Sequence, residues 1–354
     1  MILLTIIAFI IILGLLVFVH EFGHFITAKL SGIKVEEFGF GFPPKIFSIK
    51  RGETEYSVNW IPMGGFVRML GEEEASKNPR SFGMQSVAKR ILIIISGVLM
   101  NLVLAVIILT IGFSIGMTPI VTDPSTIKGT QTPEIIIASI NGSSPAEKVG
   151  LTSGDIILGF SKIEDFQKFT QANLGKEVTV KIRHDYKNED KKVTLSDNKE
   201  APLGVALVEA TKVKLSVWGS FKLAFLETGR TIKAIFVFLY GFFHDLFTGH
   251  AKEATEGVAG PVGMFTITKQ AVRLGMAYVL QFAALLSINL AAMNILPFPA
   301  LDGGRLVFIV AEGIRGKKVL KMELENLIHW VGFFILIALI VLITYHDIIR
   351  LVRG

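Results

Sequence analysis

The residues with the most specific chemistry are two histidines four positions apart in HEFGH, His20 to His24. On a helix, side chains at i and i+4 lie on one face, so His20 and His24 can bind one metal ion while Glu21 lies beside it. The spacing predicts a hydrolytic metal site with Glu21 as catalytic base. A second interpretation treats the three side chains as interfacial polar residues or as part of a proton path.

The element that must carry this motif is an apolar helix. The 18 residues from Ile2 to Val19 are uncharged, which is long enough to enter a bilayer core about 30 Å thick. The segment lacks the basic start and the small-residue cleavage site of a signal peptide, so we expect it to be retained. The metal site is therefore expected inside the membrane.

The composition of the chain predicts a multi-span membrane protein. Hydrophobic residues make up 51% and charged residues 19% of its 354 residues, too apolar for an ordinary globular protein. The chain has no cysteine, so histidine and carboxylate side chains must supply any zinc ligands. Its net charge of +6 is spread along loops without a nucleic-acid motif, so we expect anionic membrane lipid as a partner and no nucleic acid.

Charge and hydropathy together predict about four transmembrane helices, at 1–30, 91–117, 278–311 and 327–346. The connections 31–90 and 312–326 are rich in Lys and Arg, which places them in the cytoplasm by the positive-inside rule. The N-terminus and the tail 347–354 then lie outside. The apolar but charged stretch within 211–277 connects two points outside the membrane, because 118–210 follows span 2 and span 3 runs inward to the cytoplasmic loop 312–326. It must therefore cross the membrane an even number of times. We expect no crossing, as for an interfacial amphipathic helix.

The segment 31–90 is expected to contain a small sheet on the cytoplasmic side of the membrane. Lys45 to Lys50 and Thr54 to Ile61 resemble the strands of a hairpin, and a third extended piece runs from Gly64 to Met69. A sheet edge with a glycine pair, as at Gly64-Gly65-Phe66, can accept an extended peptide as an added strand. The alternative is a hairpin that only packs on the helices.

The third span is expected to be broken at NILPFPALDGGR, Asn294 to Arg305. Pro297 and Pro299 remove backbone donors, and a break at membrane depth is tolerated only where protein or a water-filled cavity surrounds it. Asp302 follows the break and becomes the candidate third ligand, because spans 1 and 3 run in the same direction. Two imidazoles and a carboxylate leave a fourth position for water, as in catalytic zinc sites.

Two asparagines are candidate polar groups near this site. Asn294, beside the break, is expected to hydrogen-bond substrate backbone or a developing oxyanion. Asn101 lies four residues after Gly97 in span 2, where the glycine permits close helix packing. For Asn101 both substrate contact and a structural hydrogen bond between helices remain open.

Residues 118–210 have the composition of an extracytoplasmic soluble α+β domain. The run INGSSPAEKVGLTSGDIIL, from 140 to 158, resembles a PDZ domain of the bacterial protease type. Such a domain is expected to bind a peptide by strand addition or to restrict substrates by size. A purely structural cap is the alternative.

With HEFGH, GVLMN, the PDZ-like block and NILPFPALDG in this order, nearly the whole chain resembles the site-2 protease family of intramembrane zinc metalloproteases. Within that family it resembles the bacterial RseP-like group, with a single PDZ domain. The resemblance implies Zn²⁺ ligands at His20, His24 and Asp302, catalytic Glu21, substrate contacts from Asn101 and Asn294, and a membrane-reentrant β-element with Gly64, Gly65 and Phe66 that clamps substrate.

The expected function is therefore regulated intramembrane proteolysis in a bacterial plasma (inner) membrane. The expected substrates are single-span membrane proteins, such as anti-sigma factors or remnant signal peptides. The alternative is a transporter or ion-pathway protein with intramembrane His, Glu and Asp, but we find no inverted repeat of the broken segment. A catalytically silent PDZ scaffold would not need the intact set of His20, Glu21, His24 and Asp302.

Overall fold

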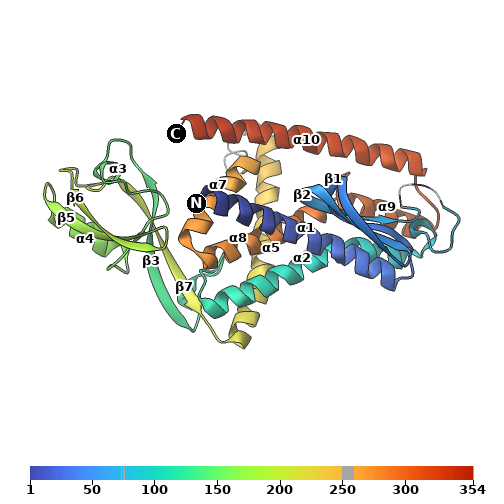
Figure 1. Ribbon diagram of the computed structural model, residues 1–354, viewed down its shortest axis with the longest axis horizontal. Coiled ribbons are helices and arrows are strands. Elements are labelled where there is room, and N and C mark those ends of the chain that lie inside the picture. Colours follow the sequence, from blue (N-terminus) through green and yellow to red (C-terminus); the bar gives the residue numbers. More distant parts are fainter. Residues whose placement is uncertain (73, 75, 249–258, 354) are drawn as a thin grey trace. The chain divides into compact units, whose positions relative to one another are not determined.

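The computed structural model describes residues 1–72, 74, 76–248 and 259–353 (Figure 1). The chain divides into two compact units. One comprises 1–5, 107–227 and 266–282; the other comprises 6–106, 228–265 and 283–354. The candidate residues of HEFGH and of the broken segment all belong to the second unit.

Four helices in the described part of the chain are long and apolar enough to cross a membrane. They are α1 (Ile2–Leu30), α2 (Val87–Ile115), α8 (Met276–Asn294) and α10 (Met322–Arg353, apolar to Ile349). The other helices are α3 (Pro145–Lys148), α4 (Ile163–Ala172), α5 (Val217–Phe247), α7 (Pro261–Leu274) and α9 (Asp302–Arg315), with 3₁₀ turns η1 (Phe82–Met84) and η2 (Pro124–Thr126).

The break predicted in the third apolar segment separates two helices. Helix α8 ends at Asn294 and α9 begins at Asp302, so residues 295–301 form a non-helical connection. Helix α2 starts four residues before the expected 91, and α10 extends beyond 327–346 at both ends. Hydropathy marks the apolar part of a helix, whereas the hydrogen-bonded backbone continues into its polar ends.

The segment 35–69 forms two long strands, β1 (Val35–Arg51) and β2 (Thr54–Met69), where the sequence indicated three short pieces. The strands fold back on themselves, because Phe38 lies opposite both Val67 and Tyr56. The first half of β1 therefore has a partner on each side. Residues 65–69 pair only with this half of β1 among the described residues, so they form an edge of the sheet.

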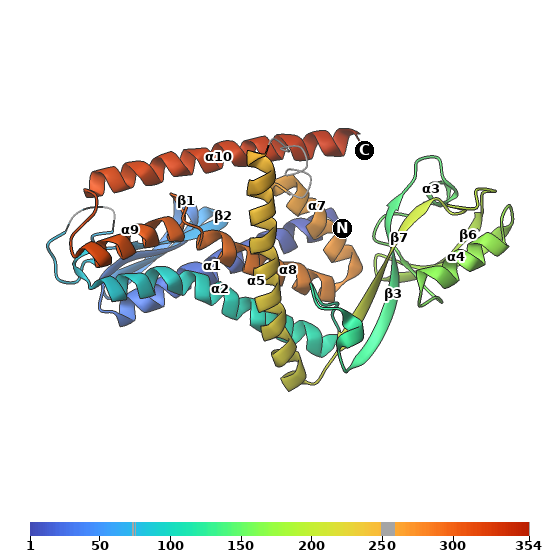
Figure 2. The ribbon, with the colours of Figure 1, turned by 180° about the vertical axis from the view of Figure 1, so that it is seen from behind.

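An apolar core joins this sheet to the helices around HEFGH. Figures 1 and 2 show β1 and β2 beside α1, with α2 and α9 alongside. The core consists of buried residues from all five elements and the adjoining loops: Ala28, Ile33, Val35, Met69, Phe82, Ile93, Ile94 and Ile309. Burying these side chains stabilises the packing of the sheet against the helices by roughly 1.5 to 3 kcal/mol for each large residue.

The turn between β1 and β2 is fixed by ion pairs. Arg80 donates to both carboxylate oxygens of Glu53, at 2.7 and 2.6 Å, and Lys29 at the end of α1 donates to the same carboxylate at 3.1 Å. The bonds from Arg80 and Lys29 lower the pKa of Glu53 to about 2. The carboxylate therefore stays charged throughout the ordinary pH range.

Residues 130–214 form a five-stranded sheet in the order β6-β5-β4-β3-β7. Its strands are β3 (Thr130–Ile140), β4 (Ile156–Ile157), β5 (Glu177–His184), β6 (Lys187–Thr194) and β7 (Val205–Lys214). The core beneath it contains the fully buried Ile135, Ile137 and Ile182, with Phe166 of α4. Strand β7 was not predicted from the sequence. It pairs along the full length of β3 and extends the folded region beyond the expected boundary at 210.

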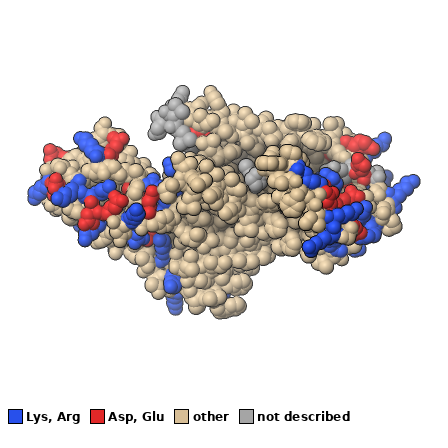
Figure 3. All heavy atoms as spheres, viewed as in Figure 1, with Lys and Arg blue, Asp and Glu red and all other residues tan. Residues whose placement is uncertain are grey.

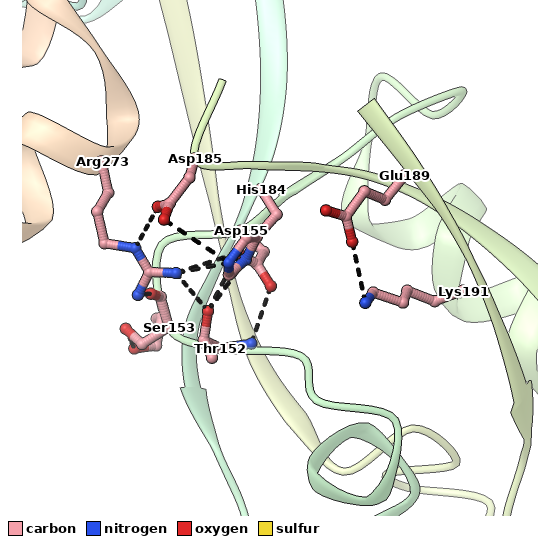
Figure 4. Close-up of polar contacts among 9 residues, drawn as sticks. Thr152, Ser153, Asp155, His184, Asp185, Glu189, Lys191 and Arg273 are labelled. Carbon is pink, nitrogen blue, oxygen red and sulfur yellow. Dashed lines mark hydrogen bonds and ion pairs between the residues drawn. The ribbon is translucent and has the colours of Figure 1, made fainter. Parts of the chain in front are cut away.

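This sheet domain is tied to α7 by Arg273 (Figure 4). Its guanidinium donates through Nε to Asp185 Oδ1 at 2.9 Å and through its terminal nitrogens to Thr152 Oγ1 at 2.6 Å and the Ser153 carbonyl at 3.3 Å. His184 completes the group by bonding the buried carboxylate of Asp155 at 2.7 Å. The domain and the second half of α7 therefore belong to one packed unit.

Helix α5 occupies the stretch for which we expected an interfacial helix. It is continuous over 31 residues and is not among the membrane-capable helices of the described chain. One of its charges, Glu227, is fully buried and accepts a hydrogen bond from the Thr122 amide at 3.2 Å. Residues 249–258, within the expected region 211–277, lie outside the described residues.

Charged side chains gather in two places on the face drawn in Figure 3. They cover the five-stranded domain and the region of β1, β2 and the loop that follows, while the surface over the helices is almost free of Lys, Arg, Asp and Glu. An uncharged surface over long apolar helices has the polarity that the core of a bilayer requires.

Candidate metal centre

Three side chains converge where α1 meets the start of α9. His20 Nε2 lies 3.0 Å and His24 Nε2 3.3 Å from Asp302 Oδ2, and the two histidine Nε2 atoms lie 3.2 Å apart. No other group of three or more His, Cys, Asp or Glu ligand atoms in the described part of the chain could hold a metal ion in this way. The HEFGH motif and the residue after the break are thus brought together.

These residues fit a metal ion on the evidence of their own hydrogen bonding. Asp302 Oδ2 is buried and has no hydrogen-bond partner among the described residues, although both imidazoles face it. Buried polar atoms in native proteins are normally paired, so an atom in this state marks a position for a ligand. Two imidazole nitrogens and one carboxylate oxygen are a donor set that suits zinc, whereas magnesium and calcium prefer oxygen donors alone.

His24 is oriented by the backbone of α2. Its Nδ1 lies 2.8 Å from the Ile93 carbonyl oxygen. A carbonyl oxygen can only accept, so Nδ1 carries the proton and Nε2 presents its lone pair to Asp302 and His20. The tautomer of His24 is therefore the one that metal binding needs.

Asn101 lies behind His20, on the ring nitrogen that faces away from Asp302. Its side-chain Nδ2 is 3.2 Å from His20 Nδ1, the residue is fully buried, and its backbone carbonyl accepts a hydrogen bond from Ser287 Oγ of α8 at 2.8 Å. With Nε2 as the metal-binding atom, Nδ1 of His20 is protonated and needs an acceptor. A flip of the Asn101 amide exchanges Nδ2 for Oδ1 at this position and supplies that acceptor, and it gives a partner to Oδ1, which otherwise has none among the described residues. The geometry favours orientation of His20 over contact with substrate.

Glycines allow α1 and α2 to approach at the metal centre. A side chain on Gly97 would overlap the rings of His24 and His20, and a Cβ on Gly23 would lie 2.5 Å from the Ser96 carbonyl oxygen. The close packing of α2 against α1 that was expected at Gly97 is thus confirmed, and both imidazoles lie in contact with α2 at this glycine.

The connection 295–301 folds back over the first turn of α9. A side chain on Gly303 would overlap the carbonyls of Ile295 and Leu296, and one on Gly304 would overlap that of Phe298. Only glycine fits at both positions, which explains the two glycines after Asp302. The carboxylate of Asp302 lies at the N-terminus of α9, where the helix dipole favours negative charge.

Asn294 is the amide on the metal-facing side. Its Nδ2 is 3.4 Å from His20 Nε2, and the residue is partly exposed, unlike Asn101. It ends α8 directly before the break. Asn294 is therefore placed where a group bound near the three ligand atoms would meet it.

Glu21 lies next to the edge of the β1–β2 sheet. A Cβ on Gly65 would be 3.3 Å from Glu21 Cγ and 3.1 Å from the Gly39 carbonyl oxygen. The neighbouring Gly64 has φ +117°, and a side chain there would overlap the ring of Phe42. The glycine pair thus lets the edge strand approach Glu21. The ring of Phe66 lies over Gly39 of β1, the strand paired with this edge.

Several groups that hold this site were not predicted from the sequence. The Ile93 carbonyl leaves no sequence signal because any residue has one. Ser287 is a small polar residue in an apolar helix, and His329 is an ionisable residue in a membrane-capable segment. Both could have been noticed, because polar residues in such segments usually have a partner or a function.

Comparison with known proteins places this arrangement in a family. The profile described as peptidase family M50 matches residues 8–339. A Clostridium perfringens protein that is assigned by its name to the zinc metalloproteases is 37% identical over 340 residues, covering 94% of this chain and 95% of the relative. The zinc metalloprotease RasP of Shouchella clausii is 33% identical, and the regulator of sigma-W protease RasP of Bacillus subtilis is 30% identical; each comparison covers 98% of this chain and 99% of the relative.

Proposed function

The chain belongs to peptidase family M50 and is a multi-pass membrane zinc metalloprotease of the site-2 type, and from this premise we propose that it cleaves single-span membrane proteins within the bilayer. His20, His24 and Asp302 are the proposed zinc ligands and Glu21 the catalytic base. The observation that carries this assignment is the convergence of three ligand atoms from two separate helices. The family membership sets the transporter interpretation aside.

In the proposed mechanism a zinc ion would activate the water and the scissile carbonyl, and side chains of the protein transfer the proton and stabilise the developing charge. A zinc ion held by this ligand set would lower the pKa of a water molecule toward about 7 and polarise the scissile carbonyl. Glu21, one residue after a proposed ligand and beside the sheet edge, takes a proton from the attacking water and passes it to the leaving amine. Asn294 donates its amide hydrogens to the carbonyl oxygen as negative charge develops there.

The proposed mode of substrate binding follows from the hydrogen bonding of a membrane helix. Every amide within such a helix is already bonded, so a peptide bond can be cleaved only after local unwinding, which exposes amides that need new partners. The free edge at 65–69 offers those partners, directly beside Glu21. An unwound segment of substrate would add to this edge as a strand and align its carbonyl with the base.

The substrate class is proposed from the name of a relative and from the domain with the five-stranded sheet. The Bacillus subtilis relative is named a regulator of sigma-W protease, which supports an anti-sigma factor or a similar single-span protein as substrate. Remnant signal peptides share the same single apolar segment. We assign the domain with the five-stranded sheet as a PDZ-like domain that selects substrates outside the membrane.

The proposed orientation is that of a bacterial plasma-membrane protein with its N-terminus, PDZ-like domain and C-terminus outside. The basic segments around β1 and β2 and between α9 and α10 would then lie on the cytoplasmic side. With this orientation α5 does not cross the bilayer and remains at its outer surface.

Replacing the proposed base tests the mechanism. In Glu21→Gln, the purified protein should retain zinc but cleave a single-span model substrate about 10² to 10⁴ times more slowly, because the amide cannot accept the proton. Cleavage is followed by gel analysis and zinc by atomic absorption. Glu323→Gln, at an exposed position at the start of α10, is the matched control and should cleave normally. Normal cleavage by Glu21→Gln would exclude Glu21 as the base.

Blocking the sheet edge tests strand addition. Gly65→Val places a branched side chain between Glu21 and the Gly39 carbonyl, so kcat/KM should fall by about tenfold or more while zinc content is unchanged. Gly142→Val, where a side chain meets open space, is the control. An unchanged kcat/KM in Gly65→Val would argue against binding at this edge.

Single cysteines test the orientation, since the chain has none of its own. An impermeant maleimide should label Asn188→Cys and Thr248→Cys in intact cells, but Lys317→Cys only after the membrane is opened. Labelling of Lys317→Cys in intact cells would reverse the proposed sidedness. Protection of Thr248→Cys while Asn188→Cys is labelled would show that α5 crosses the bilayer and would overturn the count of four spans.

A further inference from the structure

The turn that precedes Asp302 has a backbone conformation that needs support. Ala300 has φ +77°, in the left-handed region that residues with a side chain rarely adopt. Such a conformation persists only where the surrounding structure holds it. Because Ala300 is two residues before Asp302, its conformation sets where α9 begins and where the carboxylate points.

The support comes from α10, far along the sequence. His329 Nδ1 accepts a hydrogen bond from the Ala300 amide at 2.9 Å. Gly332, three residues later on the same face of α10, lies against Pro299, where an added Cβ would be 2.5 Å from both the proline Cβ and its carbonyl oxygen. A histidine and a glycine thus contact both residues of the turn.

The remaining amides of the connection bond locally. The amide of Ile295 donates to Ala291 and that of Leu296 to Met293, both in α8, while Phe298 and Leu301 bond within the connection. Prolines 297 and 299 have no amide hydrogen to give. Among the described residues, the hydrogen bond from the Ala300 amide to His329 is therefore the one backbone amide bond that links 295–301 to an element other than α8 and α9.

His329 acts through the backbone and not at the metal. Its ring is not part of the group of converging ligand atoms, and its Nδ1 is engaged by Ala300. An Nδ1 that accepts leaves the proton on Nε2, so the ring is the neutral tautomer. The rings of Phe308 of α9 and His329 meet in a T-shaped contact, with centroids 5.9 Å apart. The imidazole is thus held between the turn and the helix that carries Asp302.

We propose that His329 and Gly332 are positioning residues for Asp302. They hold the Pro299–Ala300 turn in its left-handed conformation, and this places the carboxylate at Nε2 of His20 and His24. This inference rests on the proposed role of Asp302 as a zinc ligand. Loss of the support would let the turn relax, displace the carboxylate and weaken zinc binding without removing any ligand.

The test measures how fast purified full-length protein, loaded with zinc, releases the ion to an excess of chelator. His329→Leu keeps the bulk but removes the acceptor. It should release zinc about 10 to 100 times faster than the parent, because losing a group that orients a metal ligand typically weakens metal affinity about 10- to 100-fold and a weaker site releases its ion faster. His329→Asn should stay within about threefold, because its side-chain oxygen can accept the same bond as Nδ1. Gly332→Ala, which displaces Pro299 by overlap, should also release zinc faster.

Two further variants separate the possible failures. His346→Leu removes an exposed histidine of the same helix and should behave as the parent. Asp302→Ala should release zinc fastest. If His329→Leu matches the parent while Asp302→Ala loses zinc, the positioning role is wrong and the ligand set stands. Equal release by His329→Leu and His329→Asn also overturns the role of the acceptor. If Asp302→Ala holds zinc as well as the parent does, the proposed ligand set itself fails.

Discussion

The carboxylate of Asp302 reaches the histidines because the helical backbone is interrupted between Asn294 and Asp302. A continuous helix at membrane depth would satisfy its own amides, but it would leave no unpaired end at which a carboxylate, an asparagine and a substrate could meet. The interruption frees several backbone groups, and the protein supplies partners for them. Gly303 and Gly304 let the connection fold onto α9, and α10 holds its last turn.

His20 and His24, by contrast, lie on an unbroken helix, α1, which packs closely against α2. At Gly23 and Gly97 helices α1 and α2 approach so closely that the imidazoles lie on the backbone of α2. One imidazole bonds a carbonyl and the other an amide side chain, so each ring presents the same nitrogen inward. In a low-dielectric setting a fully paired polar group is well defined, whereas an unpaired one is costly.

The sequence indicated the parts of the centre whose chemistry lies in side chains at fixed spacing. HEFGH places both histidines on one helical face, and two prolines before an aspartate mark the break, so the convergence of His20, His24 and Asp302 could be anticipated. The orientation of these residues could not, because the Ile93 carbonyl has no sequence signature and His329 is 27 positions beyond Asp302. Strand β7 was missed because its partner β3 is distant in sequence. The first half of β1 was missed because glycines and prolines interrupt its local pattern.

The central claim is that two imidazoles and one carboxylate hold the ion. X-ray absorption at the zinc edge of the purified protein tests this most directly, because the scattering of imidazole rings can be counted. The account predicts four-coordinate zinc with two imidazoles and oxygen donors at about 2.0 to 2.2 Å. The chain has seven histidines, so three or more imidazoles at the zinc would contradict the proposed set of two imidazoles and one carboxylate.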